Sequence, residues 1–217
     1  MATSFPRSPR LLKGGLVLLN PNTSAVLRVI VLQYNPDTLT RSLQIQGVGE
    51  TGDRSEALRI KAPAVETIKI DAEVDATDQL ETGQTTAAQF GIHPQLAALE
   101  TLAHPTARQL QNNNALAQSG TLEIIPMETP LTVFVWSRSR IVPVRLTELS
   151  ITEDAFDPSL NPIRAKVSLG MRVLTVNDVG FSHKGGSLFM SHLRQKEQLA
   201  GRARGGGIDV FGIGGLA

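Results

Sequence analysis

The sequence contains no cysteine and few aromatic residues, and each scarcity excludes a class of function. Without cysteine, disulfide bonds, thiol catalysis and thiolate metal sites are impossible. Aromatic residues make up 4% of the chain, with one tryptophan and one tyrosine, which argues against stacking platforms for bases or sugars. No apolar run approaches the roughly 20 residues of a membrane-spanning helix, so direct membrane insertion is not expected.

Neither sign of charge is in excess. The 217 residues include 21 Lys and Arg against 20 Asp and Glu, a formal net charge of +1. Nucleic-acid-binding domains usually carry a basic field, so no nucleic-acid partner is expected. The basic N-terminus has only a short apolar part, broken by Gly14 and Gly15. We interpret it as an arm and not as a signal peptide, and we expect synthesis and assembly in the cytoplasm.

Motifs for catalysis or cofactor binding are also lacking. The four histidines never occur at HxH or HxxxH spacing, so a zinc site is not expected. Neither a nucleophile elbow nor a phosphate-binding loop is present. An acidic cluster lacks the glycine and terminal glutamate of the known calcium loop, and we favour a solvated strand end; it consists of Asp71, Glu73, Asp75 and Asp78. We therefore predict no catalytic residue, no metal site, no cofactor and no enzymatic activity.

What the sequence does contain is alternation of apolar and polar residues at period 2, the pattern of half-buried strands. It is clearest over residues 163–174 and also runs through 65–74. Over 141–153 the apolar set changes parity near Thr147 and Glu148, which predicts a bulge in that strand. One amphipathic helix is predicted at 94–102, with Pro94 in its first turn.

The segment Leu27 to Leu43 is predicted to be central. Its first half is apolar and rich in β-branched residues, which predicts a strand buried on both faces. Asn35-Pro36-Asp37-Thr38 is a turn sequence, and a second strand begins at Leu39. The unit is therefore predicted as strand, proline turn and strand.

The predicted fold class is mainly β with one flanking helix, as a two-sheet sandwich or a partly closed barrel. Segments 46–62, 75–84 and 109–120 are predicted to be loops. The predicted domain division is an N-terminal arm at 1–14, a β domain at 15–177 and a C-terminal tail at 178–217. That tail combines a short helix at 187–199 with a glycine-rich end and is predicted to lie outside the β core.

Four segments, in order, resemble the contractile injection system tube protein family. Val29–Leu39 resembles its F-x-Y/F-N-P-x-x-L opening, and Lys69–Asp78 is similar to its strand with a D-x-T-D turn. His93–Glu100 is similar to its P-x-L-x-x-L helix. Glu153–Ala165 matches its E-x-F-D-x-x-L-N-P-x-x-A turn into the last strand. The resemblance covers roughly residues 15–177.

The resemblance implies a phage tail-tube-like fold and a non-enzymatic structural role. Six copies would form a ring whose inner sheet lines a channel. The implied position is the tube-initiator or adaptor ring of the baseplate, with the spike protein on one side, inner-tube proteins on the other and other baseplate subunits around it. The phage-tail-like particle would be released or associated with the cell envelope. Many related adaptors carry a LysM module, and the glycine-rich end of this chain does not resemble one.

Two groups of cations are candidate functional residues. Arg54, Arg59 and Lys61 belong to the 46–62 loop, and we hypothesise that they contact an adjacent subunit or layer. A second group lies on the polar face of the strand at 163–174 and is hypothesised to face the channel: Arg164, Lys166 and Arg172.

Two alternatives remain open. The chain could be the bulk inner-tube subunit of the same particle, although the long C-terminal segment favours the adaptor because a repeating ring has little room for it. From another class, it could be a monomeric β-sandwich that binds a carbohydrate or a peptide.

Overall fold

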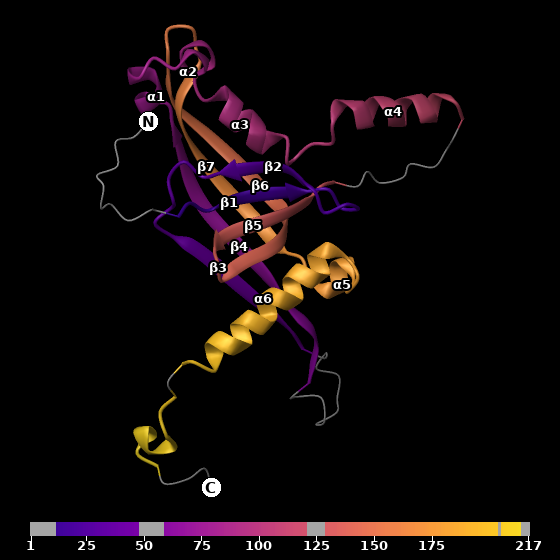
Figure 1. Cartoon of the computed structure of the whole chain (residues 1–217), viewed down its shortest axis with the longest axis vertical. Coiled ribbons are helices and arrows are strands. Elements are labelled where there is room, and N and C mark those ends of the chain that lie inside the picture. Colours follow the sequence, from indigo (N-terminus) through magenta and orange to yellow (C-terminus); the bar gives the residue numbers. More distant parts are fainter. Residues whose placement is uncertain (1–11, 48–58, 121–128, 204, 214–217) are drawn as a thin grey trace.

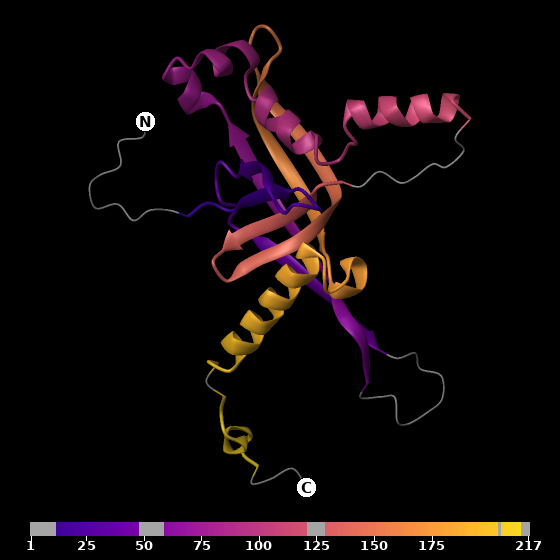
Figure 2. The same ribbon diagram turned by 45° about the vertical axis from the view of Figure 1, so that its right-hand side comes forward.

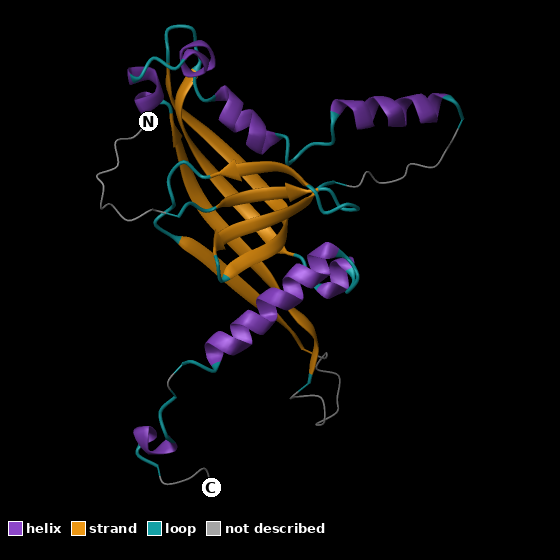
Figure 3. Cartoon of the chain, in the orientation of Figure 1, coloured by secondary structure: helices purple, strands orange, loops and turns teal. Residues whose placement is uncertain are grey.

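The computed structural model describes residues 12–47, 59–120, 129–203 and 205–213. Its main element is one continuous sheet of seven antiparallel strands in the order β2-β1-β5-β6-β7-β4-β3 (Figures 1 and 3). The mainly β prediction is confirmed, and the sheet is not closed, since β2 and β3 are its two edges. The strands are β1 (Gly15–Leu19), β2 (Val26–Val31), β3 (Leu39–Gly47), β4 (Ile60–Asp75), β5 (Leu131–Ser137), β6 (Arg140–Phe156) and β7 (Pro162–Val173).

The two layers of the predicted sandwich are two halves of this one sheet. In Figure 3 the strands β1, β2 and β5 cross the long strands β4 and β7 at a steep angle. One hydrophobic cluster joins the halves, with Leu16 of β1 and Phe134 of β5 on one side and Ile68 of β4 and Leu169 of β7 on the other. The sheet therefore packs against itself, as sheets do at orthogonal corners.

Strand β6 carries the chain from one half to the other. Over Arg140–Val144 it pairs with β5, and over Val144–Phe156 it pairs with β7. The β6–β7 register shifts between Leu146 and Glu148, so the predicted bulge near Thr147 is confirmed. An extra residue bends a strand and increases its twist, which suits the place where the sheet turns.

The alternating strands bury the expected faces. On β7 and β4 the inward side chains are almost fully buried, and they include Val167, Leu169, Ile68 and Ile70. These strands lie side by side in the middle of one sheet half.

The prediction for Leu27–Leu43 is confirmed in its order of strand, connection and strand, as β2 and β3, but the predicted burial is wrong. Strands β2 and β3 do not pair with each other; they are the opposite edges of the sheet. Nor is β2 buried on both faces, since 57% of Val29 is exposed. The connecting segment 32–38 is fixed elsewhere: Gln33 Nε2 donates to the Asp75 carbonyl (2.6 Å) and its Oε1 accepts from the Asp75 N–H (2.9 Å). The side-chain amide of Gln33 thus makes the two hydrogen bonds to the Asp75 backbone that a paired strand residue would make. Because Asp75 is the last residue of β4, the connecting segment lies beside the end of β4 before β3 begins.

Helices are more numerous than the sequence analysis expected. The predicted helix at 94–102 is confirmed as α3 (His93–Glu100), which buries Leu96 and Leu99. The loop predictions at 75–84 and 109–120 are wrong. The predicted helix at 187–199 is confirmed within α6 (Lys184–Ala200). The additional helices are α1 (Thr77–Glu81), α2 (Thr85–Phe90), α4 (Ala107–Gln118), α5 (Val176–Val179) and the 3₁₀ helix η1 (Ile208–Phe211).

Helix α4 forms because its first turn is well capped. The Thr106 hydroxyl accepts from the Gln109 N–H (3.2 Å), and Gln109 Oε1 accepts from the Thr106 N–H (2.9 Å), a complete capping box. Figures 1 and 2 both show α4 projecting away from the sheet. Its polar composition, which suggested a loop, is that of a helix with no buried residue.

Helix α6 packs against the sheet. Phe189 belongs to the main hydrophobic cluster and His192 is 6% exposed, so α6 differs from the expected tail outside the core. Beyond α6, every side chain described from Gly201 to Ile213 is exposed. The boundaries at residues 14 and 177 stay predictions, and residues 1–11 of the arm lie outside the described residues.

Candidate functional site

The three cations predicted to face a channel lie on one polar face of the sheet. Each makes an ion pair with a neighbouring element. Arg164 Nε lies 2.8 Å from Asp75 Oδ2, Lys166 Nζ lies 3.9 Å from Asp154 Oδ2, and Arg172 Nη2 lies 2.8 Å from Asp178 Oδ1. That this face lines a channel stays a prediction.

Neighbouring strands turn this face into a surface of mixed charge. Ser168 of β7 donates to Asp71 of β4 (2.5 Å), and Lys69 of β4 lies 3.5 Å from Glu148 of β6. Hydrogen bonding from Thr77 and from the Arg164 guanidinium holds the pKa of Asp75 below its ordinary value. Asp75 is therefore ionised at neutral pH. The face combines acidic and basic side chains, so it has no strong field of one sign.

Both edges of the sheet expose apolar side chains. Strand β2 exposes Val26, Leu27, Val29 and Val31, and strand β3 exposes Leu43 and Ile45, the latter with 73% of its surface accessible. The outer backbone groups of each strand have no neighbouring strand among the described residues. An unpaired apolar edge is a template for another strand.

The cations predicted to contact an adjacent subunit lie near the β3 edge. Arg59 and Lys61 are exposed at the start of β4, where Ile60 pairs with Gly47 at the end of β3. Arg54 lies outside the described residues. Contact of Arg59 and Lys61 with another copy stays a prediction.

Sequence reasoning missed a buried ionic cluster that ties α6 to β3 and β4. Glu66 is 5% exposed; its Oε1 accepts from Arg41 Nε (2.6 Å) and its Oε2 from Lys196 Nζ (2.9 Å). Burial opposes ionisation of Glu66, but the hydrogen bonds from Arg41 and Lys196 outweigh it and hold its pKa below the ordinary value. The sequence contained a signal for this cluster. Glu66 has the same parity as the inward-facing Ile68 of the same strand, so its side chain should also point inward.

His192 lies beside this cluster with both ring nitrogens buried and without a hydrogen-bond partner among the described residues. Burial lowers its pKa, and the positive charges of Lys196, Arg41 and Arg140 lower it further, while Glu66 acts in the opposite direction. His192 is therefore neutral at pH 7 and part of the packing of α6.

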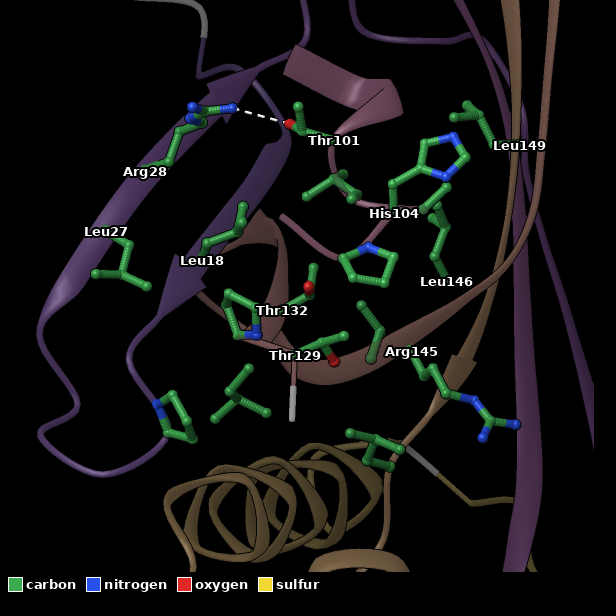
Figure 4. A pocket seen from close by; sticks show the side chains of 18 of the residues that line it. Leu18, Leu27, Arg28, Thr101, His104, Thr129, Thr132, Arg145, Leu146 and Leu149 are labelled. Carbon is green, nitrogen blue, oxygen red and sulfur yellow. Dashed lines mark hydrogen bonds between the residues drawn. The ribbon is translucent and has the colours of Figure 1, made fainter. Parts of the chain in front are cut away.

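A groove of about 830 Å³ lies between the two sheet halves (Figure 4). Leu18 and Leu27 form one wall and Leu146 and Leu149 the other, with the segment after α3 between them. Arg28 Nη1 donates to Thr101 Oγ1 across one end (2.9 Å). The walls are mainly apolar, so the groove suits an apolar segment better than a charged substrate.

Within the described residues there is neither a cluster of metal-ligating side chains nor a helix suited to span a membrane. The part of the chain that the structure describes contains no group of three or more His, Asp or Glu side chains that could hold a metal ion. None of its described helices is both long and apolar enough to cross a membrane.

Comparison with known proteins identifies no family. No protein-family model matches the chain, and no curated protein matches it. Among solved structures, the chain is similar to one from the "tail of empty GTA particle", determined with C6 symmetry. The two are 11% identical with a TM-score of 0.29, over 74% of this chain and 90% of that chain.

Proposed function

We propose that this chain is a non-enzymatic structural subunit of a contractile, phage-tail-like injection particle, where it forms the tube-initiator or adaptor ring between spike and inner tube. The observation that carries the proposal is the pair of apolar sheet edges. Val29 and Val31 of β2 and Leu43 and Ile45 of β3 are exposed on edge strands that have no further neighbouring strand in the part of the chain that the structure describes.

Two different edges support a ring rather than a symmetric dimer. If β2 of one copy pairs with β3 of the next, every copy uses both edges and the contact is head-to-tail. Head-to-tail contacts close into rings when the rotation between copies divides a full turn, and closure removes the open edges. The number six, the spike and inner-tube partners, and the surrounding baseplate subunits come from the family resemblance.

The polar face of β7 supports the orientation of the ring. Once the edges pair, this face forms a continuous inner or outer surface of the ring. Its ion pairs combine both signs of charge, which suits a water-filled channel that does not bind the molecules passing through it. We place Arg164, Lys166 and Arg172 toward the channel. Arg59 and Lys61, at the start of β4, would then point to an adjacent layer.

The projections favour an adaptor over a bulk tube subunit. Helix α4 extends from one side of the sheet and the segment after α6 from another (Figures 1 and 2). A ring that stacks many times on itself must accommodate these projections in every layer, whereas an adaptor meets them once. Copy number per particle, from quantitative mass spectrometry, separates the two roles: one ring for an adaptor and many for a tube subunit.

The experiment that tests the proposal combines light scattering with electron microscopy of the purified full chain. Rings with a central channel are expected, alone or with spike and inner-tube proteins from the same genome. In the variant Val29→Lys/Val31→Lys, two charges on the β2 edge should prevent strand pairing between copies. The matched control is Thr152→Lys, on the polar face of β6, which should assemble normally.

A monomeric ligand-binding module remains the second candidate, because the groove in Figure 4 is large enough for a small apolar ligand. A wild-type chain that stays monomeric at high concentration and beside its partners would favour this role. Cells that lack the chain but still assemble ordered particles would refute the adaptor role.

A further inference from the structure

Two apolar surfaces remain that the ring contact through β2 and β3 does not pair. One is the groove of about 830 Å³ between the sheet halves, and the other is the short segment after α6. In that segment Val210 and Phe211 are exposed, Phe211 at 78%. Figures 1 and 2 both show η1, which contains them, beyond the end of α6 and away from the sheet.

We propose that residues 209–213 of one copy dock in this groove on a second copy, as a strap between subunits. The inference rests on the self-assembly proposed above and goes beyond the edge pairing. The groove walls carry Leu18, Leu27, Leu146 and Leu149, which offer apolar contacts to Val210 and Phe211.

Geometry favours a second copy over the chain's own groove. His183, next to the start of α6, lines the groove, and the 17 residues of α6 carry the chain away from it, by about 25 Å at ~1.5 Å per residue. The eight residues 201–208 that lead to the segment span at most about 26–29 Å when fully extended. A return to the same groove would therefore demand a fully extended strand running back along α6.

Charge points to the same pairing. Asp209 is the one charged residue of the segment 209–213. The groove is bordered by Arg28 and Arg145, which Figure 4 places on opposite sides of it. Glu148 also lines the groove, and its carboxylate pairs with Lys69 of β4 (3.5 Å). Docking that brings Asp209 to Arg28 or Arg145 would place the acidic side chain beside a guanidinium.

The absence of cysteine from the chain makes a direct test possible. One preparation carries Ile213→Cys, which keeps Val210 and Phe211, and another carries Thr147→Cys, whose side chain lines the groove and is exposed. Mixing the two and oxidising should give a disulfide-linked pair, at least tenfold more than with the control Thr77→Cys, an exposed residue of α1 outside the groove. No linked pair, or equal linkage to both positions, overturns the inference.

Two further results distinguish a failure of the proposed strap from a failure of the proposed ring. A protein carrying both Ile213→Cys and Thr147→Cys that links within one chain, while the mixture does not link, overturns the second copy as occupant. Rings from Phe211→Ser that are as stable to dilution as wild-type rings also overturn the strap, yet leave the proposed function standing. Conversely, linkage in the mixture from a chain that never forms rings supports the contact and removes the ring.

Discussion

Glu66 and Lys196, 130 residues apart in sequence, form the contact that joins the C-terminal helix to the sheet, with Lys196 Nζ 2.9 Å from Glu66 Oε2. Arg41 of the edge strand β3 binds the other carboxylate oxygen. One buried carboxylate therefore links α6, β4 and β3. Strand β3, which we propose pairs with a neighbouring copy, is thus linked to α6 through Glu66.

Removal of this carboxylate should destabilise the fold. Glu66→Ala leaves Arg41 and Lys196 near one another without their anion. Loss of one partner of a buried pair costs about 3–5 kcal/mol, and partial exposure of both cations reduces this to about 2–3 kcal/mol. Urea unfolding at one protein concentration measures it. Glu73→Ala, on the exposed side of the same strand, is the control and should change the free energy of unfolding by less than about 0.5 kcal/mol.

The neutral His192 should make the fold sensitive to mild acid. Its folded pKa is lowered from the ordinary value of 6.5, so below pH 6.5 the unfolded chain binds a proton that the folded chain resists. The free energy of unfolding should fall as pH drops below 6.5, by at most about 1.4 kcal/mol per pH unit. The pKa of Glu66 is lowered from 4.5, so its contribution is lost only in stronger acid.

Unfolding measured from pH 8 to pH 5 in His192→Leu and His192→Gln tests this effect. Both variants remove the titrating group, one with an apolar and one with a polar side chain, so both should flatten the profile even if their stabilities differ. A slope between pH 6.5 and pH 5 that persists in both variants would assign the effect to another group.

Strand alternation was the part of the fold that sequence could predict, because it depends on local side-chain parity. Residues 65–74 and 163–174 bury the predicted faces, and the bulge near Thr147 was visible as a change of parity. Strand partners depend on contacts distant in sequence. An apolar run such as β2 has the same pattern whether it is covered by its own chain or by another.

The same reasoning explains what was missed at the candidate site. Arg164, Lys166 and Arg172 were correctly placed on one polar face, but their carboxylate partners belong to other elements. Helix α4 was missed because it buries no residue and so lacks the apolar stripe on which helix prediction depends.

Gly91, between α2 and α3, should not tolerate a side chain. Its φ is +55°, and a Cβ there would collide with the Pro162 carbonyl, which accepts a hydrogen bond from the Ile92 N–H (2.8 Å). Gly91→Ala should lower the free energy of unfolding by about 2–4 kcal/mol. Gly83→Ala is a matched control, since Gly83 has φ +67° but nothing within 4 Å of an added Cβ. Its smaller cost, about 1 kcal/mol, isolates the collision from the backbone strain.

The two sheet edges should complement each other when separately blocked. Val29→Lys/Val31→Lys disables β2 and leaves β3 intact, while Leu43→Lys/Ile45→Lys does the reverse. Each variant alone should stay monomeric, because a head-to-tail ring needs both edges. Mixed in equal amounts, they should form dimers that grow no further, since one intact β3 meets one intact β2 and both remaining edges are blocked.

Native mass spectrometry of the mixture, with one variant isotope-labelled, distinguishes the arrangements. A mixed dimer as the largest species is the result expected for β2–β3 pairing. Dimers of a single variant would instead mean that an edge pairs with its own copy, β3 with β3 or β2 with β2, which gives closed two-fold dimers and removes the basis for a ring. Higher species in the mixture would mean that copies associate through a surface other than the edges.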